Sequence, residues 1–254
     1  RAVASRALDT RALMGNSVLD AMLGGGLPRG YSLLVAGPSG SGKSILASAF
    51  LAEGARSGET GVLVSFEQHP MRSRHRELAK LIEAGQVGLV EGRGPDLSME
   101  EIVQRVRHEV QRLDATRVVL DSLSGFELAL APDFRTDFRE SLLGLVKTLA
   151  QADVTLLMTS ELEDRYTDLR FSPYGAAFLT DAIIVQRYIE VDSQLQRMLA
   201  VVKVRASAHS NELRAYRIDA SGIQIGATLA QHEGLLGGRP TYKSVRDEHG
   251  SALP

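Results

Sequence analysis

The hydrophobic positions of this chain follow one pattern up to about residue 180 and another after it. In the first part, short apolar runs alternate with segments whose apolar residues recur at helical spacing. The runs predict buried strands at residues 32–36, 61–66, 87–90, 117–121 and 155–158. Because strands that alternate with helices form a parallel sheet covered on both faces, this part predicts an α/β domain.

Helices are predicted between these strands. One begins at Lys43, directly after a glycine-rich loop. Another runs from residue 98 to about 113, because Ser98 and Glu101 form a capping box. A third is strongly amphipathic, with one face that carries Phe134, Phe138, Leu142, Leu145, Val146 and Leu149.

After residue 180 the apolar residues recur at every second position, between short turns. Strands are predicted at residues 182–191, 199–205, 215–218 and 223–225, as an antiparallel extension of the sheet. We therefore predict three parts: an N-terminal arm or linker at 1–13, one domain at 14–230, and a polar, Gly/Pro-rich C-terminal tail at 231–254. Since the chain begins with Arg rather than Met, we expect it to be a piece of a longer or processed chain.

Composition excludes several classes of protein. The 254 residues carry a formal net charge of −2, so no global basic field draws the chain to nucleic acid or to an anionic membrane. The absence of cysteine excludes disulfides and thiolate metal sites. No apolar run approaches the roughly 18–20 residues that span a bilayer, and no signal peptide begins the sequence. A cytoplasmic location is therefore expected.

The strongest chemical signal is the phosphate loop at residues 37–44, which reads Gly-Pro-Ser-Gly-Ser-Gly-Lys-Ser. Glycines let such a loop curl so that its amides converge on an anion, and the helix behind it adds its positive end. Lys43 would contact the β- and γ-phosphates, and Ser44 would bind Mg²⁺. The expected ATP-binding positions in the loop are Ser39, Gly40, Ser41, Gly42, Lys43, Ser44 and Ile45.

Two acids at strand ends complete the candidate site. Asp121 ends an apolar strand, which is where a phosphate-loop protein places the carboxylate that holds magnesium. Glu67 follows the second strand and should emerge at the same edge of the sheet, where an acid orients or deprotonates the attacking water. From position alone, a solvated loop glutamate is an equally good interpretation of Glu67.

Four ordered motifs resemble the KaiC-type branch of the RecA-fold ATPases. They are Leu-Gly-Gly-Gly-Leu-Pro-Arg-Gly at 23–30, Ser-Phe-Glu at 65–67, Val-Leu-Asp-Ser-Leu at 119–123 and Lys-Val-Arg-Ala-Ser-Ala-His at 203–209. The resemblance covers roughly residues 14–240. It implies a RecA-like P-loop NTPase fold, with a mostly parallel central sheet flanked by helices, and a homo-oligomer that is a hexameric ring with Mg-ATP between neighbouring copies.

The resemblance also assigns residues that reach the neighbour's nucleotide. Lys203 and Arg205 match positions that contact its γ-phosphate, and Arg197 matches a further arginine that acts in trans. Val204, Ser207 and His209 match positions that line the neighbour's nucleotide. Because residues two apart on a strand share a face, we expect Arg197, Lys203 and Arg205 to line up together. Without the resemblance, a solvated basic strand end would be the simpler interpretation.

Two departures from the family pattern affect the expected activity. The family often has paired glutamates after the second strand, whereas this chain has Glu67 and Gln68. Clock-type members phosphorylate adjacent hydroxyl residues before an Ile-Thr-Asp segment, but here Ala177 and Phe178 precede residues 179–181. We therefore expect an ATPase without the usual autokinase cycle, although Thr180 and Ser172 remain as other acceptors.

Three other functions stay open. The chain could be an autokinase that uses other acceptors, or a nucleotide-gated scaffold that hydrolyses ATP negligibly while signalling to a protein partner. A DNA-acting RecA relative would need basic loops near the ring centre. Residues 165–175 hold only Arg165 and Arg170, set against Asp164 and Asp168, so nucleic acid is an unlikely partner.

Overall fold

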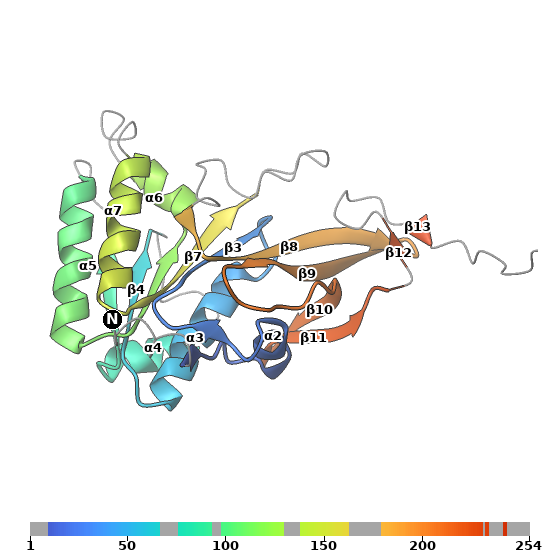
Figure 1. The fold of residues 1–254 in the computed structure, drawn as a ribbon, viewed down its shortest axis with the longest axis horizontal. Helices are drawn as coiled ribbons and strands as arrows, with labels where there is room; N and C mark the ends of the chain where they lie inside the picture. The colour runs from blue at the N-terminus through green and yellow to red at the C-terminus, as the bar shows by residue number, and fades with distance from the viewer. Residues whose placement is uncertain are drawn as a thin grey trace, which may run out of the picture.

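The computed structural model describes residues 10–66, 76–92, 98–129, 138–162, 179–230, 232–233 and 241–242. Within these residues, a nine-stranded sheet runs in the order β11-β10-β9-β8-β3-β7-β6-β4-β5. The six strands from β8 to β5 are mutually parallel, whereas β9, β10 and β11 continue the sheet in antiparallel fashion. The predicted fold class is therefore confirmed (Figure 1).

The strands lie close to their predicted positions. The parallel ones are β3 (Ser32–Gly37), β4 (Gly61–Ser65), β5 (Val87–Glu91), β6 (Arg117–Asp121), β7 (Thr155–Glu161) and β8 (Ala182–Val191). The antiparallel ones are β9 (Gln194–Val204), β10 (Arg214–Asp219) and β11 (Gly222–Thr228). The largest differences are that β7 extends to Glu161, β9 begins at Gln194 and β11 extends to Thr228.

Helices cover both faces of the sheet. One face packs against α5 (Met99–Leu113), α6 (Leu123–Ala129) and α7 (Phe138–Gln151). The other packs against α2 (Ser17–Met22), α3 (Lys43–Arg56) and α4 (Arg76–Glu83). The N-cap half of the predicted capping box is present, because the Ser98 hydroxyl accepts a hydrogen bond from the Glu101 amide at 3.2 Å, whereas the Glu101 carboxylate pairs with Arg105. None of the described helices is long and apolar enough to cross a membrane.

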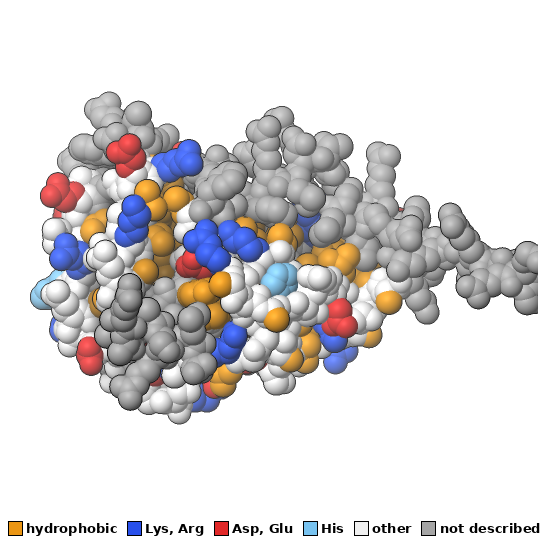
Figure 2. Space-filling view, viewed as in Figure 1, with side chains coloured by type: hydrophobic (Ala, Val, Ile, Leu, Met, Phe, Trp, Pro, Cys, Tyr) orange, Lys and Arg blue, Asp and Glu red, His pale blue; other side chains and the backbone are white. Residues whose placement is uncertain are grey.

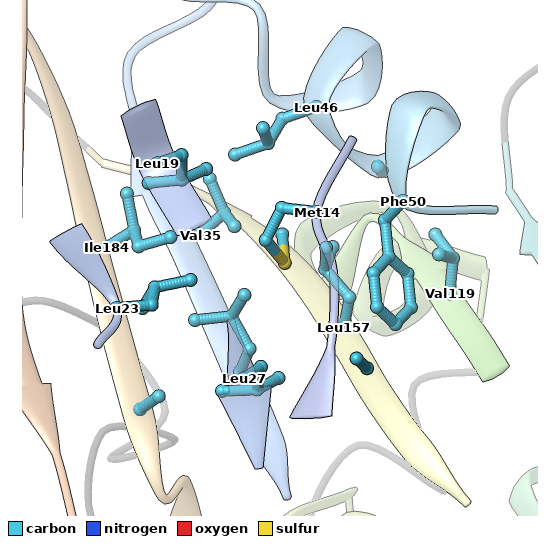
Figure 3. Packing of buried hydrophobic residues seen from close by; sticks show 14 of the residues in the cluster. Met14, Leu19, Leu23, Leu27, Val35, Leu46, Phe50, Val119, Leu157 and Ile184 are labelled. Carbon is cyan, nitrogen blue, oxygen red and sulfur yellow. The ribbon is translucent and has the colours of Figure 1, made fainter. Parts of the chain in front are cut away.

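Alternation along β3 divides the core into two layers. Leu34 and Ala36 face α5 to α7, whereas Leu33 and Val35 face α3. Figure 3 shows the second layer, in which the side chains of Met14, Leu23 and Phe50 lie against the sheet. Both faces of β3 are buried, as its uninterrupted apolar run predicted.

The prediction that residues 1–13 form an arm is wrong for residues 10–13. Strand β1 (Arg11–Ala12) pairs with β2 (Leu27–Pro28), and Ala12 is fully buried. The buried guanidinium of Arg117 donates a hydrogen bond to the Leu13 carbonyl at 2.7 Å. The contacts that hold this segment are to residues far away in sequence, so its local pattern carried little signal.

The predicted C-terminal tail contains a further short pairing. Strand β12 (His232–Glu233) is antiparallel to β13 (Thr241–Tyr242). The rest of residues 231–254 lies outside the described residues.

Candidate functional site

The phosphate loop connects β3 to α3 at the carboxyl edge of the parallel strands. Gly40 and Gly42 have φ angles of +75° and +98°, in the region that glycine adopts most readily. A Cβ on Gly37 would lie 2.8 Å from the Ser41 Oγ and 2.9 Å from the Gln186 carbonyl oxygen. The loop therefore has the curl and the close packing that the motif predicted. We call this side of the sheet the loop edge.

Lys43, the first residue of α3, directs its ammonium group back onto the loop. Its Nζ donates hydrogen bonds to the carbonyl oxygens of Gly37 at 2.9 Å and Pro38 at 2.8 Å. Burial lowers the pKa of Lys43, and the negative charges of Glu161 and Asp121 oppose that shift. A phosphate at this position would replace both carbonyl contacts with a charge-assisted pair.

The loop rests on strands β8 and β10. The Ser41 hydroxyl donates to Gln186 Oε1 at 3.0 Å, and the Tyr216 hydroxyl donates to the Ser41 carbonyl at 2.6 Å. The Tyr188 hydroxyl lies 3.4 Å from the Ser39 carbonyl. Burial raises the pKa of Tyr216, so this hydroxyl stays a donor. These contacts were not predicted, because the local pattern of strands β8 and β10 showed only the alternation of apolar and polar residues.

Two acids end neighbouring strands at the loop edge. Asp121 ends β6 and accepts a hydrogen bond from the Thr159 hydroxyl at 2.5 Å. Glu161 ends β7, which lies between β3 and β6, and is the direct partner of Gly37 across the strand pair. We did not predict Glu161 as a site residue. The strand-end rule that selected Asp121 would also have selected it, had β7 been extended past Met158.

The oxygen donors at this edge fit a magnesium ion that is shared with a nucleotide. The Ser44 hydroxyl, in the first turn of α3, and the Asp121 carboxylate are hard oxygen ligands of the kind that Mg²⁺ prefers. Among the described residues, no group of three or more His, Asp or Glu side chains could hold a metal by itself. A cation here would therefore need phosphate oxygens and water to complete its coordination.

Several predicted site positions lie outside the described residues. Glu67 and Gln68 follow Phe66, the last described residue after β4, whose ring stacks on Phe126 with centroids 4.6 Å apart. The positions expected for autokinase acceptors, Ala177 and Phe178, also lie outside them, as do residues 165–175.

Lys203 and Arg205 lie at the opposite edge of the sheet from the phosphate loop. Val204 pairs with Ala182, which in turn pairs with Leu33 near the start of β3. Four residues of β3, or about 13 Å at strand spacing, separate Leu33 from Gly37. A chain therefore cannot bring these side chains to its own phosphate loop. We call this side, with Asp181, Lys203, Arg205, Ser207 and His209, the basic edge.

The expectation that Arg197 shares a face with Lys203 and Arg205 is wrong. Ile183 pairs with Lys203 but Ile184 pairs with Val201, so Val202 is an extra residue that forms a β-bulge. The bulge inverts the alternation: Leu199 and Val201 pack in the α3 layer, whereas Val202 packs in the other.

Arg197 instead lies on the side of the chain's own phosphate loop. Its guanidinium is 5.3 Å from the ring centroid of Tyr188, whose hydroxyl faces Ser39. Its Nε is buried and has no hydrogen-bond partner among the described residues. The positive charge of Arg197 also opposes the raised pKa of Tyr216.

Arg205 is fixed to Asp181 by two contacts. Its amide donates to the Asp181 carbonyl at 2.8 Å, and its Nη1 lies 3.3 Å from Asp181 Oδ1. The other carboxylate oxygen accepts from the amide and the hydroxyl of Ser32, both at 3.0 Å. Burial and the neighbouring Arg205 lower the pKa of Lys203. Figure 2 shows Lys and Arg side chains gathered beside an acidic one near the end of β9.

The remaining expected residues at the basic edge differ in what they expose. The Val204 side chain is buried in the core, so only its backbone is available to a ligand. Ser207 and His209 lie in the loop after β9, where the Ser207 hydroxyl accepts a hydrogen bond from Arg11 at 3.0 Å. At the loop edge, the last expected contact, Ile45, is partly buried against the α3 layer.

Comparison with known proteins points to one family. The family model described as "ATPase: KaiC" matches residues 14–230. The circadian clock oscillator protein KaiC of Rippkaea orientalis is 26% identical over 250 residues, 96% of this chain and 47% of that protein. Circadian clock protein KaiC3 of Synechocystis sp. is 27% identical over 240 residues, 92% of this chain and 47% of that protein. The chain thus spans about half the length of these curated relatives.

A solved structure is similar to this chain over nearly its own full length. The KaiC-like protein PH0186 from Pyrococcus horikoshii OT3 matches with a TM-score of 0.75 and 28% sequence identity. The match covers 86% of this chain and 99% of that one.

Proposed function

This chain belongs to the KaiC family of ATPases, and we propose that it binds Mg-ATP at its loop edge and hydrolyses it with help from the basic edge of a neighbouring copy. The observation that carries the proposal is the separation of the two edges. Lys203 and Arg205 lie at the start of the parallel strands, and the phosphate loop lies at their end. Two basic side chains that cannot reach their own loop are suited to another copy's nucleotide.

At the loop edge, each residue has a separate task. Backbone amides of residues 39–45 hold the phosphates, and Lys43 exchanges its carbonyl contacts for the β- and γ-phosphates. Ser44 and Asp121 hold Mg²⁺, which neutralises charge on the phosphates when bound. Glu67 orients the attacking water or accepts its proton.

At the basic edge, Lys203 and Arg205 stabilise charge on the neighbour's γ-phosphate in the transition state. A trans arginine contributes about 10³–10⁵ in rate in related chemistry, which corresponds to about 4–7 kcal/mol of barrier. Ser207, His209 and the backbone of Val204 line the neighbour's nucleotide. Arg197 is not included in this set, because the bulge at Val202 turns it to the face of its own loop.

A head-to-tail contact between a loop edge and a basic edge is heterologous, and its repetition generates a ring where the rotation between copies closes. The family resemblance implies a hexamer, in which the nucleotide state of the ring would govern binding of a signalling partner. We propose no autokinase cycle. Ala177 and Phe178 lack hydroxyls, and Thr180 is fully buried. ATP-dependent phosphate on Thr180, found by mass spectrometry, would contradict this.

The test mixes two inactive variants. Lys43→Ala lacks a working loop edge but keeps its basic edge, and Arg205→Ala has the reverse defect. In an equal mixture, about one interface in four pairs an intact loop edge with an intact basic edge, so about a quarter of wild-type turnover should return. No recovery above the sum of the separate variants would rule out a shared site.

A further inference from the structure

Arg11 lies across the turn formed by three glycines at residues 24–26. Its Nη1 donates hydrogen bonds to the carbonyl oxygens of Gly26 at 2.8 Å and Leu23 at 3.3 Å. Its Nη2 donates to the Ser207 hydroxyl at 3.0 Å. One partly buried guanidinium thus connects three segments that are far apart in sequence: the entry strand β1, the glycine turn and the loop of the basic edge.

The glycine turn itself supports the loop that follows β9. The Ser210 amide donates to the Met22 carbonyl at 2.8 Å. Gly24 has a φ angle of +78°, and a Cβ there would lie only 2.5 Å from the Ala208 carbonyl oxygen. A side chain at position 24 would therefore push the loop away. The loop lies directly on the turn, and Arg11 holds the two together.

Arg11 therefore connects the basic edge to strand β1. Ser207 and His209 lie in the loop, and Arg205 immediately precedes it. Among the described residues, no carboxylate forms an ion pair with Arg11, so its positive charge adds to that of Lys203 and Arg205 at this edge. Arg11 also precedes residues 14–230, the range that the family model matches.

We propose that Arg11 is a positioning residue for the basic edge, which holds the loop with Ser207 and His209 in the geometry that presents Arg205 to a neighbouring copy. The proposal rests on the shared-site function given above.

The test compares Arg11→Ala and Arg11→Lys with Arg105→Ala, which removes an exposed arginine on α5. The first readout is hydrogen exchange of the Ser207 and Ser210 amides in nucleotide-free protein. Loss of one charge-assisted hydrogen bond should speed exchange there by about tenfold in both Arg11 variants. Arg11→Lys should not restore the slow exchange of the wild type, because one ammonium group cannot span the turn and the loop.

The second readout is steady-state ATP turnover. For both Arg11 variants, kcat should fall by about tenfold with KM little changed, because the loop edge that binds ATP is untouched. Faster exchange with unchanged kcat would overturn the positioning role, as would full rescue by lysine or exchange equal to that of Arg105→Ala.

Two controls keep the outcomes distinct. If Arg11→Ala fails to fold, Ser207→Ala keeps the bonds of Arg11 to the glycine turn and removes its bond to the loop, together with the 3.4 Å contact of the Ser207 hydroxyl to the Ala208 carbonyl, and it should speed Ser210 exchange in the same way. Arg205→Ala is measured in parallel. An unchanged kcat in Arg205→Ala would refute the shared site itself, whereas a reduced kcat there with normal Arg11 variants would refute only the role of Arg11.

Discussion

The loop edge and the basic edge lie at opposite ends of the same strands and differ in how they hold charge. At the loop edge, glycine conformations and backbone amides form the proposed anion site, and the cation of the phosphate loop, Lys43, is partly buried beside two acids. At the basic edge, long side chains carry the charge, and Arg205 is 60% exposed beside Asp181. The first edge is a complete cradle, whereas the second is suited to a ligand brought by another surface.

This difference separates binding from turnover. Backbone and buried groups contribute to affinity in every copy, because they need no neighbour. In the proposed shared site, the exposed Arg205 and the half-buried Lys203 would contribute only when a second copy presents its nucleotide. Variants at the two edges should therefore fall into different kinetic classes.

The largest effect on ATP binding is expected for Lys43→Ala. The variant loses two charge-assisted hydrogen bonds to phosphate, so ATP affinity should fall by about a hundredfold or more. Isothermal titration with a non-hydrolysable ATP analogue measures this directly. Arg105→Ala, on the far helix layer, serves as the control. Affinity within about twofold of wild type would remove the phosphate loop from the proposed site.

Arg205→Ala should change ATP turnover rather than the affinity for ATP. We expect turnover to fall by about a thousandfold, while the affinity for ATP changes by less than about tenfold. Solution mass with and without Mg-ATP gives a second measurement, since a contact through Arg205 should strengthen ATP-dependent assembly. An unchanged turnover, or a strict monomer that hydrolyses ATP at the wild-type rate, would contradict the shared site.

The sequence predicted the loop edge far better than the basic edge, and the reason is physical. The phosphate loop is contiguous, so eight neighbouring residues specify its curl and its cation. Asp121 followed from one rule about strand ends. The basic edge is assembled from Arg11, Asp181 and the loop after β9, which only the folded sheet brings together.

The errors have equally specific causes. Periodicity assigns one face to every second residue, so it could not detect the extra residue Val202 that turns Lys203 away from Arg197. Segment 10–13 is short and was predicted to be an arm, although a single buried cation, Arg117, anchors it. Glu161 was missed because β7 was ended three residues early.

The next prediction identifies the catalytic acid from the fall in ATP turnover. Glu67→Gln should lower turnover by about 10²–10⁴ and leave ATP binding nearly unchanged, because the amide keeps the shape but cannot accept a proton. Glu161→Gln is the matched variant, one neutralised acid at the same edge. If Glu161→Gln loses the turnover instead, the water-activating role moves to the acid beside Gly37. Wild-type turnover equal to that of both variants would favour a nucleotide-gated scaffold.

A smaller effect is expected from Asp181→Asn. Asparagine can still accept hydrogen bonds from Ser32, but it loses the charge that holds the Arg205 guanidinium. Turnover should fall by about tenfold, and Ser32→Ala, which removes the hydroxyl that donates to Asp181 and accepts from its amide but leaves the carboxylate charge in place, should change it by less than about twofold. Faster turnover in Asp181→Asn would mean that Asp181 withholds Arg205 from the neighbour rather than orienting it.

The smallest effect is expected at a buried acid in α2, and it concerns the stability of the fold rather than ATP turnover. Asp20 in α2 is buried, and its carboxylate accepts a hydrogen bond from the Met14 amide at 2.7 Å. Burial raises the pKa of Asp20, and the charge of Glu53 adds to the shift, so the folded state is destabilised once this carboxyl ionises. Asp20→Asn keeps an acceptor for Met14 without the charge.

The variant should therefore raise the free energy of unfolding by about 1 kcal/mol at pH 7. The gain should shrink as pH falls through the raised folded-state pKa and vanish below the ordinary value of 3.8, where the carboxyl is protonated in both states. Urea unfolding at several pH values tests this. ATP turnover of Asp20→Asn should equal that of wild type. A loss of turnover with a gain in stability would mean that the ionised carboxylate of Asp20 itself supports the geometry of the basic edge.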